Sequence, residues 1–356
     1  KCQAAIQSWA ELRGPAGERV GLLYDALCCR PFATALLAGI KTGAEWPTQR
    51  NGRFRLRPAS ALASYSLQEL AALEPEALAV EQSNSSIAYA RELILKCYRR
   101  LEPGEHPELE LGWFLTERVR FEHVPALAGY IEYRSAQSAV WAIAVLHRYV
   151  CSRANAWSHT LASLSDYLRA SCGSERADRG ESGDPAPWRC AELLARSVRE
   201  AMLLGVRVGQ LHAALASARD DPAFRPEVFT DAEFRAWCVG LIGSIERAAE
   251  LLAGRTELLP EADATADRLR QLARPAVERE SARLAGTSLG RKSRCHGDLH
   301  LGQVLFTGED FLVMDFEGEP ARPLAERRAK CSVLKDVAGM VRSFDYAAAG
   351  ALRQAA

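Results

Sequence analysis

Hydrophobic and polar positions alternate in one stretch of the chain in the manner of β-strands. Apolar residues at 87–89 and at 93–98 flank a short polar turn, which predicts a β-hairpin. Two further strands are predicted at 127–133 and at 140–149. Between the hairpin and these strands, the spacing of apolar residues over 108–118 predicts a helix.

The rest of the chain is mostly helical in its pattern. Apolar residues that recur every three or four positions predict helices at 156–170, 191–217, 231–252 and from 264 onward, the last one interrupted at Pro275. Gly, Ser, Pro and charged residues dominate 171–187, which indicates a surface loop. Near the start of the chain, two short helices are expected within 18–42 and a strand at 52–56. The pattern therefore predicts an α+β fold that passes from a smaller strand-rich part to a larger helical part.

Charge and composition narrow the class of protein. The 45 Lys and Arg residues balance the 45 Asp and Glu residues, which argues against a nucleic-acid binder or an electrostatic membrane anchor. Apolar runs reach only about eight residues, whereas a membrane-spanning helix needs about twenty. The ten cysteines form no C-x-x-C pair, so we expect reduced thiols and a cytoplasmic protein. The start lacks both a secretory signal and an initiating Met, so we expect a segment of a longer polypeptide.

The densest polar cluster lies between residues 295 and 317. Two apolar strands flank a turn at 307–310, so the predicted hairpin brings Gln303 and Asp315 to its open end, with Asp298 on the loop before it. Such a set suits phosphoryl transfer: Gln303 and Asp315 would hold Mg²⁺ against nucleotide phosphates, and Asp298 would take the proton of the acceptor hydroxyl. Kinase catalytic loops have the same order and similar spacing.

Two other interpretations of this cluster are weaker. The first is an ordinary structural hairpin with polar residues at its open end. The D-F-E sequence in register with Gln303 argues against this interpretation. A zinc site at Cys295, His296 and His300 would need helical H-E-x-x-H spacing or a second pair of cysteines, and the sequence has neither.

A lysine in the first hairpin is the candidate nucleotide contact. Ile94 and Lys96 share one face of their strand, which fits an apolar contact to a base and a cation at the phosphates. A carboxylate of the next helix should pair with Lys96, and we expect Glu110, with Glu108 as the alternative. A solvated surface lysine is the competing interpretation.

The segment before this hairpin stands where a glycine-rich phosphate loop would be. Ser83, Asn84, Ser85 and Ser86 offer hydroxyl, amide and backbone N–H groups to phosphate oxygens, although no Gly is present. Farther along, Arg322 follows the predicted metal ligand and either contacts substrate or belongs to a charged turn. Asp336 is placed as the N-cap of a helix.

Three motifs together resemble the maltokinases, bacterial sugar kinases related to aminoglycoside phosphotransferases and often fused to trehalose synthase. They are C-H-G-D-L-H-L-G-Q-V-L at 295–305, D-F-E-G-E-P-A-R-P-L-A-E-R-R-A-K at 315–330 and L-K-D-V-A-G-M-V-R-S-F-D-Y-A-A at 334–348. The resemblance implies a bilobal, protein-kinase-like fold with an incomplete N-terminal cap (1–79), a nucleotide-binding N-lobe (80–150) and a helical C-lobe (151–356). The implied reaction is ATP + maltose → ADP + maltose 1-phosphate, which feeds α-glucan synthesis.

The same resemblance implies roles for individual residues. Asp298 would be the catalytic base, Gln303 and Asp315 the Mg²⁺ ligands, and Lys96 with Glu110 the nucleotide pair. Residues 82–86 would cover the phosphates, and His300 would lie near the sugar hydroxyl. The adenine would meet the linker that contains His147, Tyr149 and Val150.

Two departures from the family pattern keep alternatives open. Asn155 stands where the family has an Asp, and the chain stops ten residues after Tyr346, where relatives continue. A related kinase for an aminoglycoside, choline or another sugar is one alternative. An inactive kinase-like module that associates with a trehalose synthase is the other.

Overall fold

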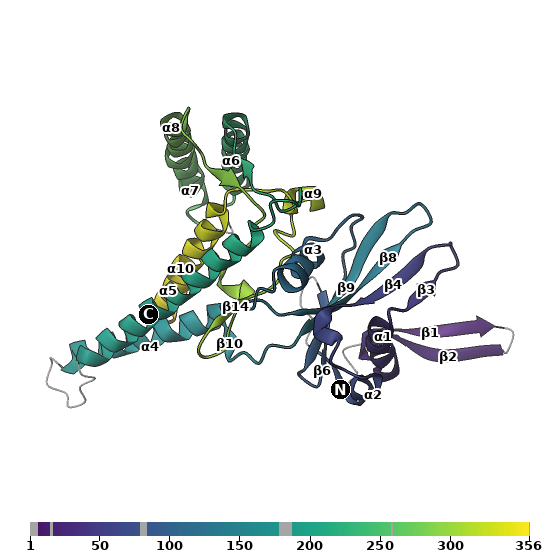
Figure 1. Cartoon of the computed structure of the whole chain (residues 1–356). Helices are drawn as coiled ribbons and strands as arrows, with labels where there is room; N and C mark the ends of the chain where they lie inside the picture. The colour runs from purple at the N-terminus through teal and green to yellow at the C-terminus, as the bar shows by residue number, and fades with distance from the viewer. Residues whose placement is uncertain (1–5, 15–16, 79–83, 178–186, 258, 356) are drawn as a thin grey trace. The chain divides into compact units, whose positions relative to one another are not determined.

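The computed structural model describes residues 6–14, 17–78, 84–177, 187–257 and 259–355 (Figure 1). The chain divides into two compact units. Unit 1 comprises Lys1–Leu215, His296–Ala329 and Leu334–Ala356, and unit 2 comprises Ala216–Cys295 and Lys330–Val333. All the residues that the sequence singled out for phosphoryl transfer belong to unit 1.

A seven-stranded antiparallel sheet forms the strand-rich part of unit 1. Its strands, in spatial order, are β3 (Glu45–Pro47), β4 (Arg53–Pro58), β8 (Leu127–Arg134), β9 (Val140–Arg148), β7 (Leu93–Tyr98), β6 (Asn84–Tyr89) and β5 (Pro75–Ala77). The strands predicted at 52–56, 127–133 and 140–149 are confirmed. Two strands from before residue 80 join this sheet by pairing with strands from beyond it, β4 with β8 and β5 with β6.

The first predicted hairpin is confirmed as β6 and β7. Ser86 pairs with Lys96 and Ala88 with Ile94, so Ile94 and Lys96 lie on one face, as expected. Ala90 and Arg91 are the central residues of a turn in which the Glu92 N–H donates to the Tyr89 carbonyl, and both have positive φ (50° and 57°), as in a type I′ turn.

Helices pack on both faces of the sheet (Figure 1). On one face, α1 (Arg30–Thr42) and α2 (Leu67–Ala72) bury apolar side chains against the strands, including Leu37 and Ile40. On the other face lies α3 (Pro107–Trp113), which continues into a π-helical turn, η4 (Phe114–Arg118), and together they confirm the helix predicted at 108–118.

The prediction of two helices within 18–42 is wrong in its first half. Residues 17–24 form β2 (Gly17–Tyr24), which pairs with β1 (Ile6–Gly14) in a separate two-stranded sheet. The helical spacing of apolar residues in this stretch is also compatible with a strand, and the pairing with β1 decides between them. Short 3₁₀ turns follow at η2 (Ala26–Cys28) and η3 (Ser60–Leu62).

Three long helices and a small sheet form the rest of unit 1. The helices are α4 (Ala156–Ala177), α5 (Pro187–Leu215) and α10 (Leu334–Ala355). The second predicted hairpin is confirmed as β13 (Val304–Phe306) and β14 (Phe311–Val313), with β10 (Ala154–Asn155) beside β13. The 3₁₀ turn η6 (Leu301–Gln303) precedes β13, and α9 (Leu324–Arg327) is one short turn. Of the loop expected at 171–187, residues up to 177 are helical and 178–186 lie outside the described residues.

Unit 2 is helical, with one short two-stranded sheet. It contains α6 (Asp231–Leu252), α7 (Ala262–Arg268), a π-helical turn η5 (Leu269–Ala273) and α8 (Arg274–Leu284), and β11 (Glu227–Val228) pairs with β12 (Arg291–Lys292). The interruption expected at Pro275 is not a break, because Pro275 lies in the first turn of α8, where its missing N–H is tolerated.

No helix in the described part of the chain is both long and apolar enough to span a lipid bilayer. Cys97, Cys151, Cys190 and Cys238 carry free thiols, as expected, and Cys238 alone among these four is buried.

Candidate active site

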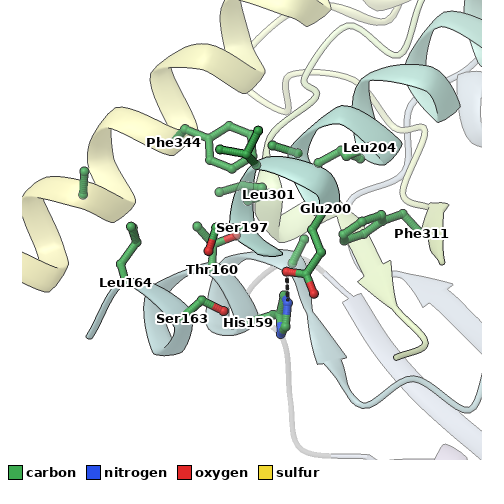
Figure 2. Close-up of a pocket in the computed structure, with 14 residues that line it drawn as sticks. His159, Thr160, Ser163, Leu164, Ser197, Glu200, Leu204, Leu301, Phe311 and Phe344 are labelled. Carbon is green, nitrogen blue, oxygen red and sulfur yellow. Dashed lines mark hydrogen bonds and ion pairs between the residues drawn. The ribbon is translucent and has the colours of Figure 1, made fainter. Parts of the chain in front are cut away.

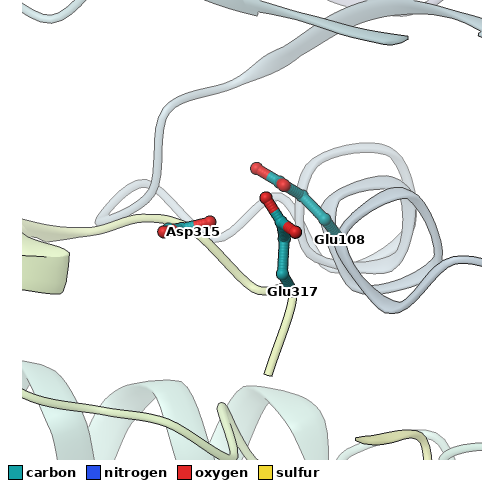
Figure 3. Close-up of side chains that lie close together, drawn as sticks. All are labelled: Glu108, Asp315 and Glu317. Carbon is teal, nitrogen blue, oxygen red and sulfur yellow. The ribbon is translucent and has the colours of Figure 1, made fainter. Parts of the chain in front are cut away.

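Lys96 of β7 meets three carboxylates in unit 1. Figure 3 shows these carboxylates, which belong to Glu108, Asp315 and Glu317. Lys96 Nζ lies 2.8 Å from Glu108 Oε2, 2.5 Å from Asp315 Oδ1 and 2.6 Å from Glu317 Oε1. The three carboxylates also approach one another, with one oxygen of each within 4.8 Å of the others. Only 13% of the Lys96 side chain and 4% of the Glu108 side chain are exposed, so this is a largely buried charge cluster.

Burial and mutual attraction set the charges of the cluster. Burial opposes the charge on Lys96, but attraction from Glu108, Asp315 and Glu317 outweighs it and holds the Lys96 pKa well above its ordinary value. Burial likewise opposes the charge on Glu108, but Lys96 keeps the Glu108 pKa well below its ordinary value. Burial raises the pKa of Glu317, against the pull of Lys96. One lysine therefore faces three acidic groups, and the cluster carries an excess of negative charge.

The expected pairing of Lys96 with Glu110 is wrong, and the alternative, Glu108, is correct. Glu110 instead receives Arg328, whose Nε and Nη2 lie 2.9 and 2.8 Å from the two Glu110 oxygens. Residues two apart on a helix point about 200° apart, so only one of these glutamates can face β7. Glu108 lies three residues before Leu111, on the buried side of α3. From this side its carboxylate can reach Lys96.

The chain after Asp315 is held against the start of α3 by two arginines. Arg327 pairs with Glu102 and donates from Nη1 to the Glu317 carbonyl at 3.3 Å, while Arg328 binds Glu110. Gly318, at φ +71°, packs against the Arg327 side chain and leaves no strain-free room for a larger residue. These contacts fix the direction in which the Asp315 and Glu317 side chains leave the backbone.

Asp336 of α10 organises the loop that carries Asp298. Its Oδ2 accepts from the His296 N–H at 2.9 Å and its Oδ1 from the Gly297 N–H at 2.8 Å, and His212 Nε2 lies 2.9 Å from Oδ2. Burial opposes the charge of Asp336, but His212, His296 and the two backbone N–H groups lower its pKa. The prediction that Asp336 caps its own helix is wrong: it lies inside the first turn of α10, and its carboxylate binds the loop instead.

Asp298 follows Gly297, which has φ +87°, and its side chain is half-buried. Burial raises its pKa, and the nearby imidazoles of His300 and His296 act in the opposite direction. Within the described part of the chain, no group donates a hydrogen bond to its carboxylate, so the oxygens remain available. His300 Nδ1 accepts from the Gly302 N–H at 3.0 Å, which fixes that imidazole at the start of η6.

Backbone hydrogen bonds connect the Asp298 loop to the strand end that carries Asp315. Met314 donates its N–H to the Gln303 carbonyl at 3.0 Å, and the Met314 carbonyl lies 2.9 Å from His296 Nε2. Through Met314, the structure therefore brings the segments of Gln303 and Asp298 beside that of Asp315, as the hairpin predicted.

The predicted phosphate loop differs from expectation. Ser83 lies outside the described residues, and Asn84, Ser85 and Ser86 are not a loop but the first residues of β6, because they pair with β7. Asn84 is buried and donates from Nδ2 to Glu317 Oε1 at 2.8 Å. Ser85 Oγ accepts from Arg99. Asn84 thus joins the charge cluster at Glu317.

The predicted linker and the predicted substrate arginine also have defined partners. His147 lies on the Lys96 face of the sheet, with Nδ1 3.2 Å from the Pro125 carbonyl and Nε2 3.7 Å from Glu108 Oε1. Tyr149 donates its N–H to the Glu92 carbonyl, and both Tyr149 and Val150 are half-buried.

Arg322 pairs with Glu319 and Glu326 on its own segment, at 2.5 and 3.2 Å. These ion pairs are those expected of a charged turn, and a contact of Arg322 with substrate stays a prediction.

A hollow of about 290 Å³ lies elsewhere in unit 1, among α4, α5 and α10 (Figure 2). Its walls are mainly apolar, and they enclose a His159–Glu200 pair in which Nε2 lies 2.8 Å from Oε2. The His159 ring also stacks on Phe306 at 3.9 Å between centroids. None of the residues of the Lys96 cluster lines this hollow.

Sequence reasoning assigned no role to Glu317 and gave the wrong role to Asp336. No strand alternation marked Glu317, because Asp315 has φ +66° and the chain turns directly after it. For Asp336 no local pattern exists, since its partners lie about 40 residues earlier in the chain.

The antiparallel sheet, the lysine paired with a helix carboxylate and the acidic group after the second hairpin belong to the aminoglycoside-phosphotransferase-like and protein-kinase-like fold, which confirms the predicted fold class. Residues 178–318 match the Phosphotransferase enzyme family.

Glucosamine kinases are similar to this chain in sequence. The enzyme of Mycolicibacterium smegmatis is 26% identical over 285 residues, which are 76% of this chain and 58% of that protein. The enzyme of Streptacidiphilus jiangxiensis is 32% identical over 145 residues, 40% of this chain and 29% of that protein. The chain thus spans well under two thirds of the length of these relatives.

Solved glucosamine kinase structures share the fold. One, in complex with glucosamine, ADP and inorganic phosphate, aligns with a TM-score of 0.65 at 20% identity over 96% of this chain and 68% of that one. Another crystal form gives a TM-score of 0.64 at 19% identity over 97% of this chain and 68% of that one.

Proposed function

We propose that the chain is an ATP- and Mg²⁺-dependent kinase that phosphorylates a sugar hydroxyl. The observation that carries this proposal is the Lys96 cluster, in which a strand lysine meets the helix carboxylate of Glu108 and the carboxylate of Asp315 at 2.8 and 2.5 Å. In kinases, a strand lysine held by a helix glutamate binds nucleotide phosphates, and an acidic residue beside it holds the metal. The matches to a phosphotransferase family and to glucosamine kinases support the same reaction class.

The donor set of the cluster fits a magnesium ion. Asp315 and Glu317 offer carboxylate oxygens, the charge excess favours a divalent cation, and Gln303 is tied to this strand end through Met314. Asp315 and Gln303 would hold the ion, with Glu317 beside them. When bound, Mg²⁺ neutralises charge on the β- and γ-phosphates. Lys96 would then exchange part of its contact with the carboxylates for the phosphate oxygens.

Asp298 would act on the acceptor. Its carboxylate is half-buried and accepts no hydrogen bond from the described residues, so it can orient a sugar hydroxyl and take its proton. Asp336 holds the backbone of the preceding residues, which limits the positions that Asp298 can adopt. His300 remains a proposed contact of the sugar. The segment from His147 to Val150, with Tyr149 between them, remains the proposed adenine contact.

Two acceptors are proposed, each from a separate observation. Glucosamine is favoured by the similarity to glucosamine kinases in sequence and in fold. Maltose is favoured by the motifs at 295–305, 315–330 and 334–348, which resemble those of maltokinases. An inactive module that works with another polypeptide, such as a trehalose synthase, is the alternative.

A coupled ADP-release assay with Mg·ATP separates these proposals. Glucosamine, maltose, glucose and kanamycin are offered in turn to the purified chain. Turnover with glucosamine or with maltose supports the sugar kinase and identifies the acceptor, whereas turnover with kanamycin alone contradicts it. If no acceptor gives ADP although Mg·ATP binds by calorimetry, the inactive module is correct.

Substitutions test the individual roles. Asp298→Asn should abolish turnover and leave Mg·ATP binding nearly unchanged, whereas Asp315→Asn should weaken Mg·ATP binding itself. Asp345→Asn, at an exposed position of α10, is the matched control and should behave as wild type. Turnover of Asp298→Asn within a few-fold of wild type would contradict the role of Asp298.

A further inference from the structure

Three arginines surround one hollow in unit 2. The hollow measures about 430 Å³, and its walls are Ala216, Arg219, Arg225, Pro226 and Arg291. All of these residues belong to unit 2, so the hollow shares no residue with the Lys96 cluster of unit 1. Its volume lies in the range of small-molecule sites.

Backbone contacts hold two of the arginines in place. Val228 of β11 pairs with Arg291 of β12, so the segment around Pro226 runs beside Arg291. Arg291 Nη1 donates to the Pro226 carbonyl at 3.4 Å, and Arg225 donates its backbone N–H to the Asp221 carbonyl at 2.7 Å. The positions of both residues are therefore defined by the fold of unit 2.

The arginines around the hollow have no acidic partner. Within the described residues, no carboxylate forms an ion pair with Arg219, Arg225 or Arg291. Glu227, the acidic residue after Pro226, is already shared by Lys292 and Lys330, at 3.3 and 2.5 Å. Asp220 and Asp221 lie close in sequence but have interactions of their own, and Asp221 Oδ1 accepts the Ala223 N–H.

Some other arginines of the same unit pair with acidic residues. Arg274 pairs with Glu246 and Glu278, and Arg283 pairs with Glu280. Three like charges around one concave surface repel one another unless an anion lies between them. The hollow therefore has the charge of an anion site, and none of the residues that the structure describes supplies its counter-charge.

We propose that Arg219, Arg225 and Arg291 bind the phosphate group of a small phosphorylated molecule at a site separate from the Lys96 cluster. A guanidinium group donates two parallel hydrogen bonds to phosphate oxygens, so three of them saturate one phosphate group. The hollow is larger than a phosphate ion needs, which leaves room for a sugar-sized body attached to it. The balanced total charge of the chain speaks against a long polyanion as the ligand.

Calorimetric titration of the whole chain, in magnesium-free buffer without ATP, tests the site. The probes are glucose 6-phosphate, inorganic phosphate and, as the uncharged control, glucose. We expect glucose 6-phosphate to bind, glucose to give no comparable signal through this site, and the affinity for the phosphate to fall as potassium chloride is raised. Tighter binding of glucose 6-phosphate than of inorganic phosphate identifies the ligand as a phosphorylated small molecule. Equal binding of the two anions identifies it as free phosphate.

The double variant Arg219→Gln/Arg225→Gln is the decisive test, since neither side chain forms a hydrogen bond or an ion pair with another described residue. We expect its dissociation constant for the phosphate probe to rise about tenfold or more. Arg255→Gln, at an exposed position of the same unit outside the hollow, should bind as wild type. Circular dichroism and Mg·ATP binding show that the variants are folded.

Equal affinity of the double variant and the wild type would overturn the proposal, because phosphate would then bind elsewhere, for example at Lys96. Tighter binding of a short single-stranded oligonucleotide than of glucose 6-phosphate, lost in the same double variant, would also overturn it in favour of a nucleic-acid contact.

Discussion

The Asp336 carboxylate lies 2.9 Å from the backbone nitrogen of His296, 40 residues earlier in the chain, and it also binds the next N–H, that of Gly297. One side chain of α10 thus satisfies two backbone donors of the loop that carries Asp298, one buried and one partly buried. Asp336→Ala should leave both donors without an acceptor and lower the free energy of unfolding by about 3 kcal/mol. Urea denaturation measures this loss.

Asp336→Asn separates charge from hydrogen bonding. Its amide oxygen still accepts one N–H, so about half of the stability loss should remain, while turnover falls because the loop is less well held. If Asp336→Ala unfolded at the wild-type urea concentration, the proposed support of the loop by Asp336 would be wrong.

Substitutions of the two glutamates of α3, Glu108 and Glu110, should have opposite results. Glu108→Gln removes a buried partner of Lys96, and since Asp315 and Glu317 still balance the lysine, the expected destabilisation is about 2 kcal/mol. Turnover of the proposed kinase should fall at least about tenfold, because Lys96 is no longer positioned.

Glu110→Gln is the control for this change. It breaks a more exposed pair with Arg328 at the far side of the helix, so stability should change by less than about 1 kcal/mol and turnover should stay near wild type. If Glu110→Gln lowered turnover more than Glu108→Gln in the ADP-release assay, Glu110 and not Glu108 would be the functional partner of Lys96.

The burial of His106 makes stability depend on pH. The ring stacks on Tyr98 with centroids 4.2 Å apart, and burial lowers its pKa from 6.5 to about 4. Between these values the unfolded chain takes up a proton that the folded chain does not. Stability is therefore complete above pH 6.5 and is lost as pH falls toward 4, by up to about 3 kcal/mol.

His106→Phe keeps the ring stack and removes the titration. Urea unfolding at intervals between pH 4 and pH 7 should show the wild type losing stability relative to this variant as pH falls. A constant difference between the two proteins across that range would contradict a buried, neutral His106.

The turn between β6 and β7 offers a stabilising change. Ala90 and Arg91 both have left-handed backbone angles, which Asn and Gly adopt at lower cost. Ala90→Asn with Arg91→Gly should raise the free energy of unfolding by about 1 kcal/mol. Thermal unfolding checks the gain, with Ala90→Asn alone as the intermediate case. An unchanged or lower midpoint would show that the turn is not type I′.

The periodic parts of the fold could be predicted from the sequence. The hairpin that carries Lys96 and the hairpin before Asp315 were predicted because each is local: two short apolar runs and a turn define the register. The β1–β2 hairpin is just as local, since Gly14 pairs with Gly17, but it was missed because the apolar spacing of its second strand also fits a helix.

The candidate site was predicted in its residue types but not in all of its contacts. Choosing between Glu108 and Glu110 required the rotational phase of α3, which Leu111 and Leu115 could have supplied because they share the face of Glu108. The partners of Arg328 and Asp336 come from distant segments, and tertiary packing alone determines them.

Lys96 and Asp315 are 219 residues apart in the sequence, yet they touch in the folded protein. A ribosome that adds about 5–20 residues per second needs roughly 11–44 s to synthesise that interval. During this time the nascent lysine can pair with Glu108, only 12 residues away, but it cannot reach its later partners. The Lys96 cluster is thus completed at a late stage of translation, and a chain truncated before residue 315 would have the strands of the sheet but lack Asp315 and Glu317 of this cluster.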